Sequence, residues 1–204
     1  MHADIPLLLF AKAPVPGQAK TRMHSVYTPD QAAIIAQRLL EMSIQNAQAH
    51  WQGSVHLCVW PNATHPFLQK MIAEYDLPYF VQDAGDLGHK MAMALRSKGW
   101  PAAVMGSDVP HCPPAVFKGA YAALQEGANV LGPCEDGGYY MLGLQQPMPE
   151  LFVNMPWGTD QVLVKTQAKL ASSSAEWCYM AELNDIDYPE DLAQLDILGG
   201  DLLY

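Results

Sequence analysis

The chain has 204 residues, of which 50% are hydrophobic and 16% are charged, and its formal net charge is -10. Half of the residues can fill a core, which excludes a disordered chain. The acidic balance argues against a nucleic-acid binder, because sequence-independent affinity for phosphates needs a broad basic surface. We therefore expect one compact domain over residues 1–204 that binds a small molecule.

The cysteines and the amino-terminal residues predict a cytoplasmic protein. Cys58, Cys112, Cys134 and Cys178 are widely spaced and include no C-x-x-C pair, which favours reduced thiols over a disulfide framework or a zinc knuckle. The first four residues lack a basic n-region, and the apolar run that follows is too short for a membrane span. We expect no membrane span and no obvious targeting signal.

Residues 5–11 predict a strand, and the loop that follows it is rich in basic residues. This loop contains three of the chain's eleven Lys and Arg residues and no acid. Such a loop at the end of a strand is typical of a phosphate site, because lysines supply point charges, arginine supplies a bidentate fork and glycine lets backbone amides approach. An ordinary solvated loop is the alternative, and the glycine–lysine spacing differs from that of a Walker loop. The candidate phosphate ligands are Lys12, Gly17, Lys20, Thr21 and Arg22.

Strands and helices then alternate, which predicts a mostly parallel sheet. Thr28 and Gln31 form a capping-box pattern around Pro29, and the apolar residues that follow recur at helical spacing. We expect a helix from Pro29 to about residue 50, a strand at 55–60, a helix at 66–75 and a strand at 78–82. The topology that this order predicts is Rossmann-like.

A glycine-containing turn follows the third of these strands. Gly85, Asp86 and Gly88 lead into a predicted helix that ends near residue 98. His89 and Lys90 in its first turn oppose the helix dipole, which prefers acids there. Either a negatively charged ligand binds at this turn, or two exposed side chains tolerate the clash.

The central feature of the sequence is a buried strand that ends in a carboxylate. Residues 102–105 are small and apolar, and Gly106, Ser107 and Asp108 follow them. In open α/β sheets the ligand lies at the carboxyl ends of the strands, so Asp108 is placed to hold a divalent cation. The alternative is that Asp108 caps the next helix, which is predicted to run from the Pro113–Pro114 pair to residue 125. His111 and Cys112 are weak evidence for a zinc site.

A second acidic turn follows a predicted strand at 129–133. Asp136 precedes two glycines and a β-rich run at 139–144. We expect this turn at the same edge of the sheet as Asp108, although a hairpin turn with ordinary surface acids is the alternative.

The carboxyl-terminal part places two more acids at the end of a strand. We expect an irregular connection at 150–157, a helix capped by Thr159 that ends near residue 170, and a strand at 177–183. Asp185 and Asp187 alternate on the extended segment that follows, so they share one face. One of them can complete a metal site with Asp108; capping of the final helix by Asp187 is the competing role.

Several of these segments together resemble a bacterial family of largely uncharacterised GT-A-type transferases. Its members belong to the nucleotide-diphospho-sugar transferase superfamily and are labelled glycosyltransferases or transferases associated with radical-SAM and selenium genes. The basic loop also resembles that of guanylyltransferases acting on phospholactate. Lys90 and Val109 stand where the family pattern has arginine and cysteine, which affects ligand geometry more than the fold. The matching segments are residues 10–22, 85–88, 106–108, 131–144, 157–159 and 185–192.

The resemblance implies a three-layer, Rossmann-like GT-A fold with a mostly parallel central sheet. It implies a nucleotide over the first strands and a divalent metal ion that joins its phosphates to Asp108. For the mechanism we expect this ion to be Mg²⁺ or Mn²⁺, and the residue pattern offers Asp187 as its second ligand. Lys20 and Arg22 then stabilise the leaving group, and the remaining phosphate-side residues of the pattern are Lys12, Gly17, Thr21, Gly85, Asp86, Gly88 and Ser107.

The activity that we expect is sugar transfer from a nucleotide sugar to a small acceptor. Asp136 is the candidate base for the acceptor hydroxyl, and Lys20 and Arg22 are the candidate charge stabilisers. The first alternative is nucleotidyl transfer from an NTP to a phosphorylated small molecule. The second alternative is a nucleotide-binding protein without catalysis.

Overall fold

A computed structural model describes residues 4–196 of the chain. The expectation about the amino-terminal signal rests in part on residues 1–3, which lie outside the described residues. In the described part, no helix is both long enough and apolar enough to cross a membrane.

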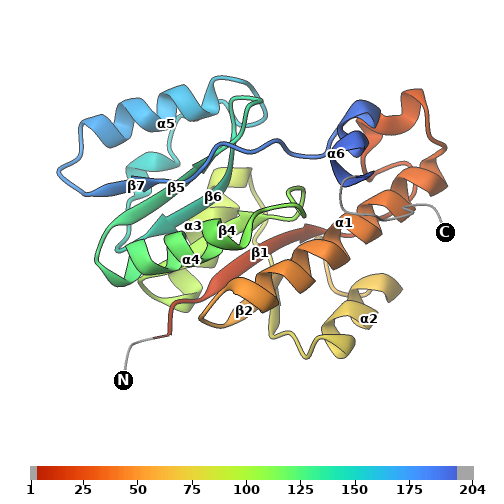
Figure 1. The fold of residues 1–204 in the computed structure, drawn as a ribbon, viewed down its shortest axis with the longest axis horizontal. Helices are drawn as coiled ribbons and strands as arrows, with labels where there is room; N and C mark the ends of the chain where they lie inside the picture. Colours follow the sequence, from red (N-terminus) through yellow and green to blue (C-terminus); the bar gives the residue numbers. More distant parts are fainter. Residues whose placement is uncertain (1–3, 197–204) are drawn as a thin grey trace.

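The centre of the molecule is a seven-stranded sheet with the order β3-β2-β1-β4-β6-β5-β7 (Figure 1). β6 runs antiparallel to both of its neighbours, and the other described pairs are parallel. The predicted mostly parallel sheet is therefore confirmed. The strands are β1 (Leu7–Lys12), β2 (Val55–Trp60), β3 (Tyr79–Val81), β4 (Ala102–Gly106), β5 (Asn129–Pro133), β6 (Tyr139–Leu144) and β7 (Trp177–Tyr179).

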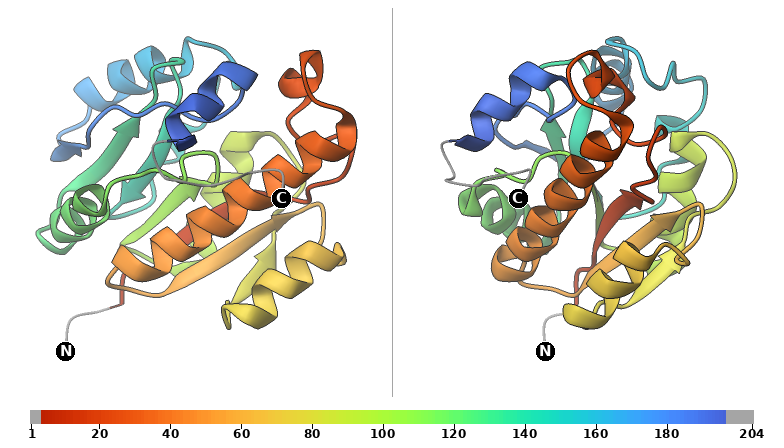
Figure 2. Two further views of the ribbon diagram at one scale, coloured as in Figure 1. Left: turned by 45° about the vertical axis from the view of Figure 1, so that its right-hand side comes forward. Right: turned by 90° about the vertical axis from the view of Figure 1, so that its right-hand side faces the viewer.

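Helices cover both faces of this sheet, which gives three layers (Figures 1 and 2). Leu7 and Leu9 of β1 face the layer of α1, α2 and α4, whereas Leu8 faces the layer of α3 and α5. This alternation follows from the two-residue period of a strand. The helices are α1 (Pro29–His50), α2 (Pro66–Glu74), α3 (Leu87–Lys98), α4 (Pro114–Gln125), α5 (Val162–Ala171) and α6 (Ala193–Asp196), with short 3₁₀ helices η1 (Thr21–Ser25), η2 (Pro149–Leu151) and η3 (Pro189–Leu192).

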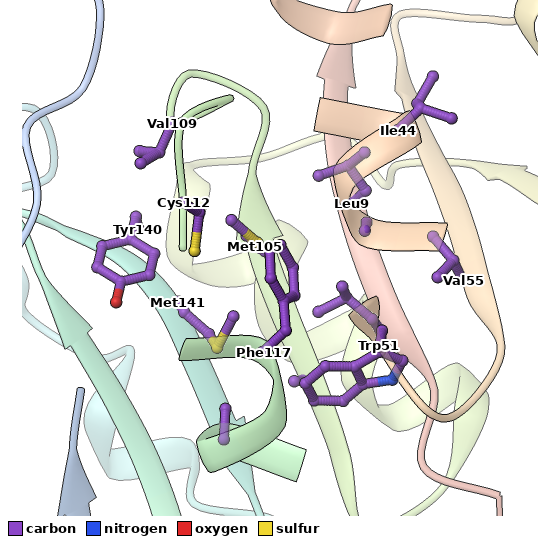
Figure 3. Packing of buried hydrophobic residues seen from close by; sticks show 14 of the residues in the cluster. Leu9, Ile44, Trp51, Val55, Met105, Val109, Cys112, Phe117, Tyr140 and Met141 are labelled. Carbon is purple, nitrogen blue, oxygen red and sulfur yellow. The ribbon is translucent and has the colours of Figure 1, made fainter. Parts of the chain in front are cut away.

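The larger core lies between the sheet and the layer of α1, α2 and α4 (Figure 3). Phe117 of α4 is 1% exposed and lies beside Met105 of β4, and Trp51 packs edge-to-face on Tyr121 with ring centroids 5.3 Å apart. The Trp51 indole also donates a hydrogen bond to the Ile5 carbonyl at 2.8 Å. Burial of these side chains fixes the strands whose ends carry the site.

A third apolar cluster joins η1 and α1 to the last part of the described chain. Ile186 is fully buried against Met23 of η1 and Ile35 and Leu39 of α1, and Leu195 of α6 completes the cluster. Figure 1 shows α6 beside the segment that precedes α1. This packing holds the segment after β7 against the basic loop after β1.

Most predicted elements are confirmed, and the exceptions have local causes. Thr28 caps α1 in a full capping box. Thr159 does not cap α5, whose N-cap is Gln161; the Thr159 hydroxyl accepts a hydrogen bond from the Gln161 amide instead. The last strand ends at Tyr179 rather than at residue 183, and Leu183 makes only an isolated bridge to Cys134.

Candidate functional site

The carboxyl ends of β1, β2, β3 and β4 meet at one edge of the sheet. Lys12 and Trp60 end β1 and β2 as register partners, and Gly106 of β4 lies opposite Phe10. A cavity of about 530 Å³ opens at this edge. We call it the basic cavity, because its lining includes Lys12, Lys20, Arg22 and Lys90.

Lys20 lies at the centre of the site, and its side chain is only 7% exposed. Its ammonium is 2.6 Å from Asp108 Oδ1 and 2.8 Å from Asp187 Oδ1, and it donates to the Ile186 carbonyl at 2.6 Å. Burial by itself would lower the pKa of Lys20, but the two carboxylates outweigh it and raise that pKa. The Lys20 ammonium is therefore charged and bridges two acids from distant parts of the chain.

The backbone of Lys20 adopts the left-handed conformation, with φ 44° and ψ 49°. A non-glycine residue pays a steric cost in this region, and such residues concentrate at functional sites. Here the conformation turns the chain into η1 at Thr21. The same turn brings the Lys20 ammonium to the edge of the sheet.

Arg22 completes the cationic side of the site. Its Nη1 atom lies 2.6 Å from Asp187 Oδ2, and its guanidinium lies 5.4 Å from the centre of the Tyr188 ring. Burial would raise the pKa of Asp187, but Lys20 and Arg22 outweigh burial and lower it. Asp187 is therefore an ionised carboxylate held by two cations.

The segment that carries Asp185 and Asp187 is fixed from both sides. The Ile186 amide donates to the Asp108 carbonyl at 2.8 Å, and the Ile186 side chain enters the third apolar cluster. Asp191 Oδ2 accepts from the amides of Asp187 and Tyr188 at 2.9 and 2.7 Å. With Ile186 turned inward, the two flanking acids point to the opposite side, as the alternation in the sequence predicts.

A second cavity of about 490 Å³ lies beside the first, on the β6 side of β4. Phe10, Arg22, Asp108 and Asp187 line both cavities, so the two adjoin at these residues. We call the second the acidic cavity, because its lining includes Asp108, Asp136, Asp160, Asp185 and Asp187.

Asp185 has the most perturbed carboxyl of this group. Burial raises its pKa from 3.8 to about 6, and the neighbouring charges of Asp187, Asp136 and Asp108 act in the same direction, whereas Lys20 opposes them. The Asp108 loop, the Asp136 turn and the Asp185 segment therefore lie at one edge, where all three acids line the acidic cavity. The sequence-based expectation that the Asp136 turn shares an edge with Asp108 agrees with this geometry.

Lys90 and Trp60 form the outer wall of the basic cavity. The Lys90 ammonium lies 3.6 Å from the centre of the Trp60 ring, which is a close cation–π contact. Partial burial lowers the pKa of Lys90, and the nearby positive charge of Lys12 lowers it further. Repulsion between like charges is relieved when an anion binds between them, which favours the anionic-ligand interpretation of this helix turn.

The predicted site residues divide into those that line one of the two cavities and those that line neither. Asp136 lines the acidic cavity; Lys12, Lys20, Thr21, Arg22, Ser107, Asp108 and Asp187 line the basic cavity. The predicted phosphate ligands Gly17, Gly85, Asp86 and Gly88 line neither cavity.

The four residues outside the cavities shape the backbone. Gly17 and Gly85 have positive φ angles of 77° and 136°, which suit glycine. Asp86 caps α3 by accepting from the His89 amide at 2.8 Å. A Cβ atom on Gly88 would lie 2.5 Å from Cζ2 of Trp157, so this glycine makes room for the indole.

The competing structural roles of the two metal-candidate acids are not observed. The N-cap of α4 is Pro113 without a side-chain cap, so Asp108 does not cap that helix. η3 begins after Tyr188, and Asp187 pairs with cations instead of capping it. No group of three or more His, Cys, Asp or Glu side chains arranged for a metal is found in the described residues, which include His111 and Cys112.

Sequence reasoning missed Trp60, Gln82 and Trp157, which also line the two cavities. Trp60 and Gln82 lie at or just after the carboxyl ends of β2 and β3, and the rule for open α/β sheets would have found them. Trp157 lies in an irregular segment without a periodic pattern, so only the family resemblance, which includes residues 157–159, marks it, and that resemblance does not assign it to a cavity.

The donor set at the junction of the cavities fits a divalent cation. Asp108 and Asp187 already direct one oxygen each at a single cationic atom, the Lys20 ammonium. Magnesium and manganese are held by one or two carboxylates together with phosphate oxygens and water. Asp108 and Asp187 would hold the ion through carboxylate oxygens. The same oxygens form the ion pairs with Lys20 in this structure.

Comparison with solved structures supports the fold. A crystal structure of a candidate nucleotide-diphospho-sugar transferase from Desulfovibrio desulfuricans G20 matches with a TM-score of 0.85 and 28% identity, over 96% of this chain and 87% of that one. A cytidylyltransferase from Leptospira borgpetersenii matches with a TM-score of 0.64 and 11% identity, over 95% and 85%. Rv0371C of Mycobacterium tuberculosis H37Rv, in complex with manganese, matches with a TM-score of 0.56 and 14% identity, over 95% and 98%.

The last two structures, at these identities, share the fold alone. No curated protein matches the chain. The model of a family described as uncharacterised proteins conserved in bacteria (DUF2064) matches residues 43–159, which is more than half of the sequence. The chain therefore belongs to the DUF2064 family.

Proposed function

We propose that the protein is a nucleotide-using transferase that moves a sugar from a nucleotide sugar to a small acceptor. The observation that carries this proposal is the position of Lys20 and Arg22 at the point where the basic cavity meets a second cavity. A diphosphate bound to these cations would present its sugar to the second cavity. The 28% identity to a candidate nucleotide-diphospho-sugar transferase supports the same class.

The basic cavity supplies what a nucleoside diphosphate requires. Lys12, Lys20 and Arg22 neutralise phosphate oxygens, and the guanidinium adds bidentate geometry. Phe10 and Trp60 line the same cavity and offer aromatic faces on which a base can stack. The cavity volume of about 530 Å³ lies within the range of small-molecule sites.

Transfer breaks the bond between the anomeric carbon and the diphosphate oxygen and forms a bond to the acceptor hydroxyl. The electron pair leaves with the diphosphate, whose growing charge Lys20 and Arg22 stabilise. Asp136 takes the hydroxyl proton; its Oδ1 accepts from the Gly138 amide at 2.8 Å, which orients the carboxylate in the turn. A Mg²⁺ or Mn²⁺ ion on Asp108 and Asp187 would add charge stabilisation at the leaving phosphates.

Nucleotidyl transfer is the second candidate, because Lys20 and Arg22 are equally suited to steady the pyrophosphate that leaves an NTP. The resemblance of the basic loop to phospholactate guanylyltransferases, and the association with radical-SAM and selenium genes, stay predictions. A nucleotide-binding protein without catalysis would show ligand binding but no turnover.

A thermal-shift screen of nucleotides and nucleotide sugars, with and without Mn²⁺, tests the proposal. A ligand that binds only the native state raises the melting temperature, so a specific nucleotide series should do so. Lys20→Ala should lose most of this shift, whereas Lys118→Ala, on the exposed side of α4, should keep it. The proposal is wrong if no nucleotide or nucleotide sugar binds.

Product analysis separates the two activities. Release of a nucleoside diphosphate from the preferred donor indicates sugar transfer, and release of pyrophosphate from an NTP indicates nucleotidyl transfer. Asp108→Asn should reduce turnover by about 10²–10³-fold, because an amide would hold the cation that stabilises the leaving group more weakly than a carboxylate does. Unchanged turnover in both Asp108→Asn and Asp136→Asn would contradict the assigned roles.

A further inference from the structure

We propose that the acidic cavity is the acceptor subsite and that it selects a small molecule carrying a positively charged amine on a partly apolar body. The inference rests on the proposed function only in assigning the nucleotide to the basic cavity. Phosphorylated and carboxylated molecules are excluded from the acidic cavity by the same charges that attract the amine.

The position of the acidic cavity makes it the place for an acceptor. It adjoins the basic cavity at Arg22, Asp108 and Asp187, where the phosphates of a bound nucleotide would lie. A group attached to the terminal phosphate therefore enters the acidic cavity. An acceptor bound there meets the bond that breaks.

The charges of the two cavities are opposite. Four cationic side chains and two carboxylates line the basic cavity, whereas five carboxylates and the single guanidinium of Arg22 line the acidic cavity among the described residues. Two of those carboxylates, Asp108 and Asp187, are paired with Lys20 or Arg22. The remaining three form no ion pair with any side chain described in the structure: Asp136, Asp160 and Asp185.

The excess of negative charge persists when the nucleotide side is filled. Lys20 and Arg22 pair with Asp108 and Asp187, whereas no described cation lies within ion-pair distance of the other three acids of the acidic cavity. Walls of low polarity strengthen the field of such a group and raise the local concentration of a cation. A protonated amine is the acceptor feature that this field favours.

The rest of the lining fits an apolar or ring-shaped body. Met91 of α3, Leu142 of β6 and Val162 of α5 line the cavity together with Tyr139 and Trp157. The Tyr139 and Trp157 rings meet edge-to-face, with centroids 6.4 Å apart. Aromatic faces bind both flat rings and cationic groups, so they suit a cationic ring compound.

An anionic acceptor finds no binding group of its own here. Arg22 is the only cation of the described residues in this lining, and Asp187 already holds it at 2.6 Å. A phosphate in the acidic cavity would face uncompensated carboxylates. The cavity therefore favours transfer to an amine-bearing molecule over transfer to a sugar phosphate or a phosphorylated acid.

Two sets of three probes, each matched in shape, test the sign of the selection. Tyramine, 4-ethylphenol and 4-hydroxyphenylacetate share a phenol ring and differ in charge. Glucosamine, glucose and glucuronate share a pyranose ring and form a second set without an aromatic ring. Dissociation constants are measured by ligand-observed NMR up to 10 mM, with wild-type protein at pH 7.5. We expect at least one amine to bind tenfold more tightly than its carboxylate counterpart. Equal or tighter binding of the carboxylates, or no binding by either amine, overturns the proposal.

Variants of the cavity locate the binding. Asp160→Asn and Asp185→Asn should each weaken amine binding about fivefold or more and reduce the preference over the neutral probe. Asp76→Asn is the matched control, because it makes the same change at an exposed residue that lines neither cavity and whose positive φ of 47° asparagine also tolerates. If amine affinity is the same in all three variants, the amine binds elsewhere and the proposal is wrong.

A nucleotide titration in parallel separates this inference from the proposed function. Nucleotide binding together with failed amine selection leaves the transferase proposal standing and overturns the acceptor inference. Amine selection without any nucleotide binding supports the charge selection of the acidic cavity and contradicts the transferase proposal.

Discussion

The two halves of the sheet edge differ in strand direction and in charge. From β3 to β4 all strands are parallel, so their carboxyl ends form one wall with Lys12 and Trp60 at the tips. Beyond β4 the neighbouring strand is β6, which runs the other way. The wall there is built by the turn that enters β6 at Tyr139 and by the segment that contains Asp185 and Asp187.

This difference teaches how an acidic protein with a net charge of -10 can contain a basic site. The loop after β1 brings its cations to the place where the antiparallel strand β6 follows β4 in the sheet. Loops from the second half of the chain bring the acids to the same place. Lys20 and Arg22 lie where the two sets meet. Changes on either side of this boundary should affect one cavity more than the other.

Removing the cation at the boundary should have the largest effect on stability. In chelator-containing buffer, Lys20→Ala leaves Asp108 and Asp187 close together without their ammonium. We expect the free energy of unfolding to fall by about 1–3 kcal/mol, less than for a fully buried pair because Asp108 is 47% exposed. Denaturant titration measures this loss.

Manganese sharpens the result. If Mn²⁺ binds the carboxylate oxygens that Lys20 contacts, the two cations compete, and Mn²⁺ should stabilise Lys20→Ala more than it stabilises the wild type. Lys118→Ala, which alters an exposed lysine, should stay within about 0.5 kcal/mol of the wild type. An equal response of Lys20→Ala and wild type to Mn²⁺ would contradict a shared site.

A change in the wall of the acidic cavity should separate the two ligands. Gly88→Ala places a methyl group 2.5 Å from Trp157 Cζ2, so the indole must move. Overpacking of this kind costs about 1–3 kcal/mol of stability, and amine binding should weaken while nucleotide binding is kept. Gly119→Ala is the control on another helix, because its added Cβ meets only Met180 Sδ at 3.8 Å, and it should be neutral or stabilising. Loss of nucleotide binding in Gly88→Ala would show that the two cavities are not independent.

The smallest expected effect concerns the pH dependence of Asp185. The folded protein raises its pKa from 3.8 to about 6, so the carboxyl favours folding below pH 4 and this contribution is lost as the pH rises through 6. Asp185→Asn cannot ionise and should therefore be more stable than the wild type at pH 7.5, by about 1–2 kcal/mol after allowance for partial exposure. The two proteins should converge at pH 4 in metal-free buffer. A stability difference that does not change with pH would refute the raised pKa.

Much of the fold follows from the sequence because its signals are local. Thr28 and Gln31 mark the start of α1, and the small apolar run before Asp108 marks a buried strand. The rule that ligands gather at the carboxyl ends of parallel strands then groups Lys20 and Asp108 at one edge, as the structure does.

The parts that could not be predicted depend on contacts distant in sequence. Gly85 has a turn role and Gly88 a packing role. The need for glycine at position 88 comes from the indole of Trp157, 69 positions later in the sequence. The capping role of Asp86 has a sequence signal, but a cap and a phosphate ligand require the same kind of residue. Trp157 and Asp160 come from an irregular connection, where no periodicity shows which side chains face a cavity.

The bond between Lys20 and Asp187 joins residues 167 positions apart. A ribosome adds about 5–20 residues per second, so the amino-terminal loop emerges roughly ten to thirty seconds before its partner exists. A nascent chain stopped short of Ile186 would contain the seven described strands and Asp108, but it would lack the Ile186 carbonyl and the Asp187 carboxylate that also hold Lys20. The Lys20 ammonium thus gains two of its three described contacts only after the segment that follows β7 has been synthesised.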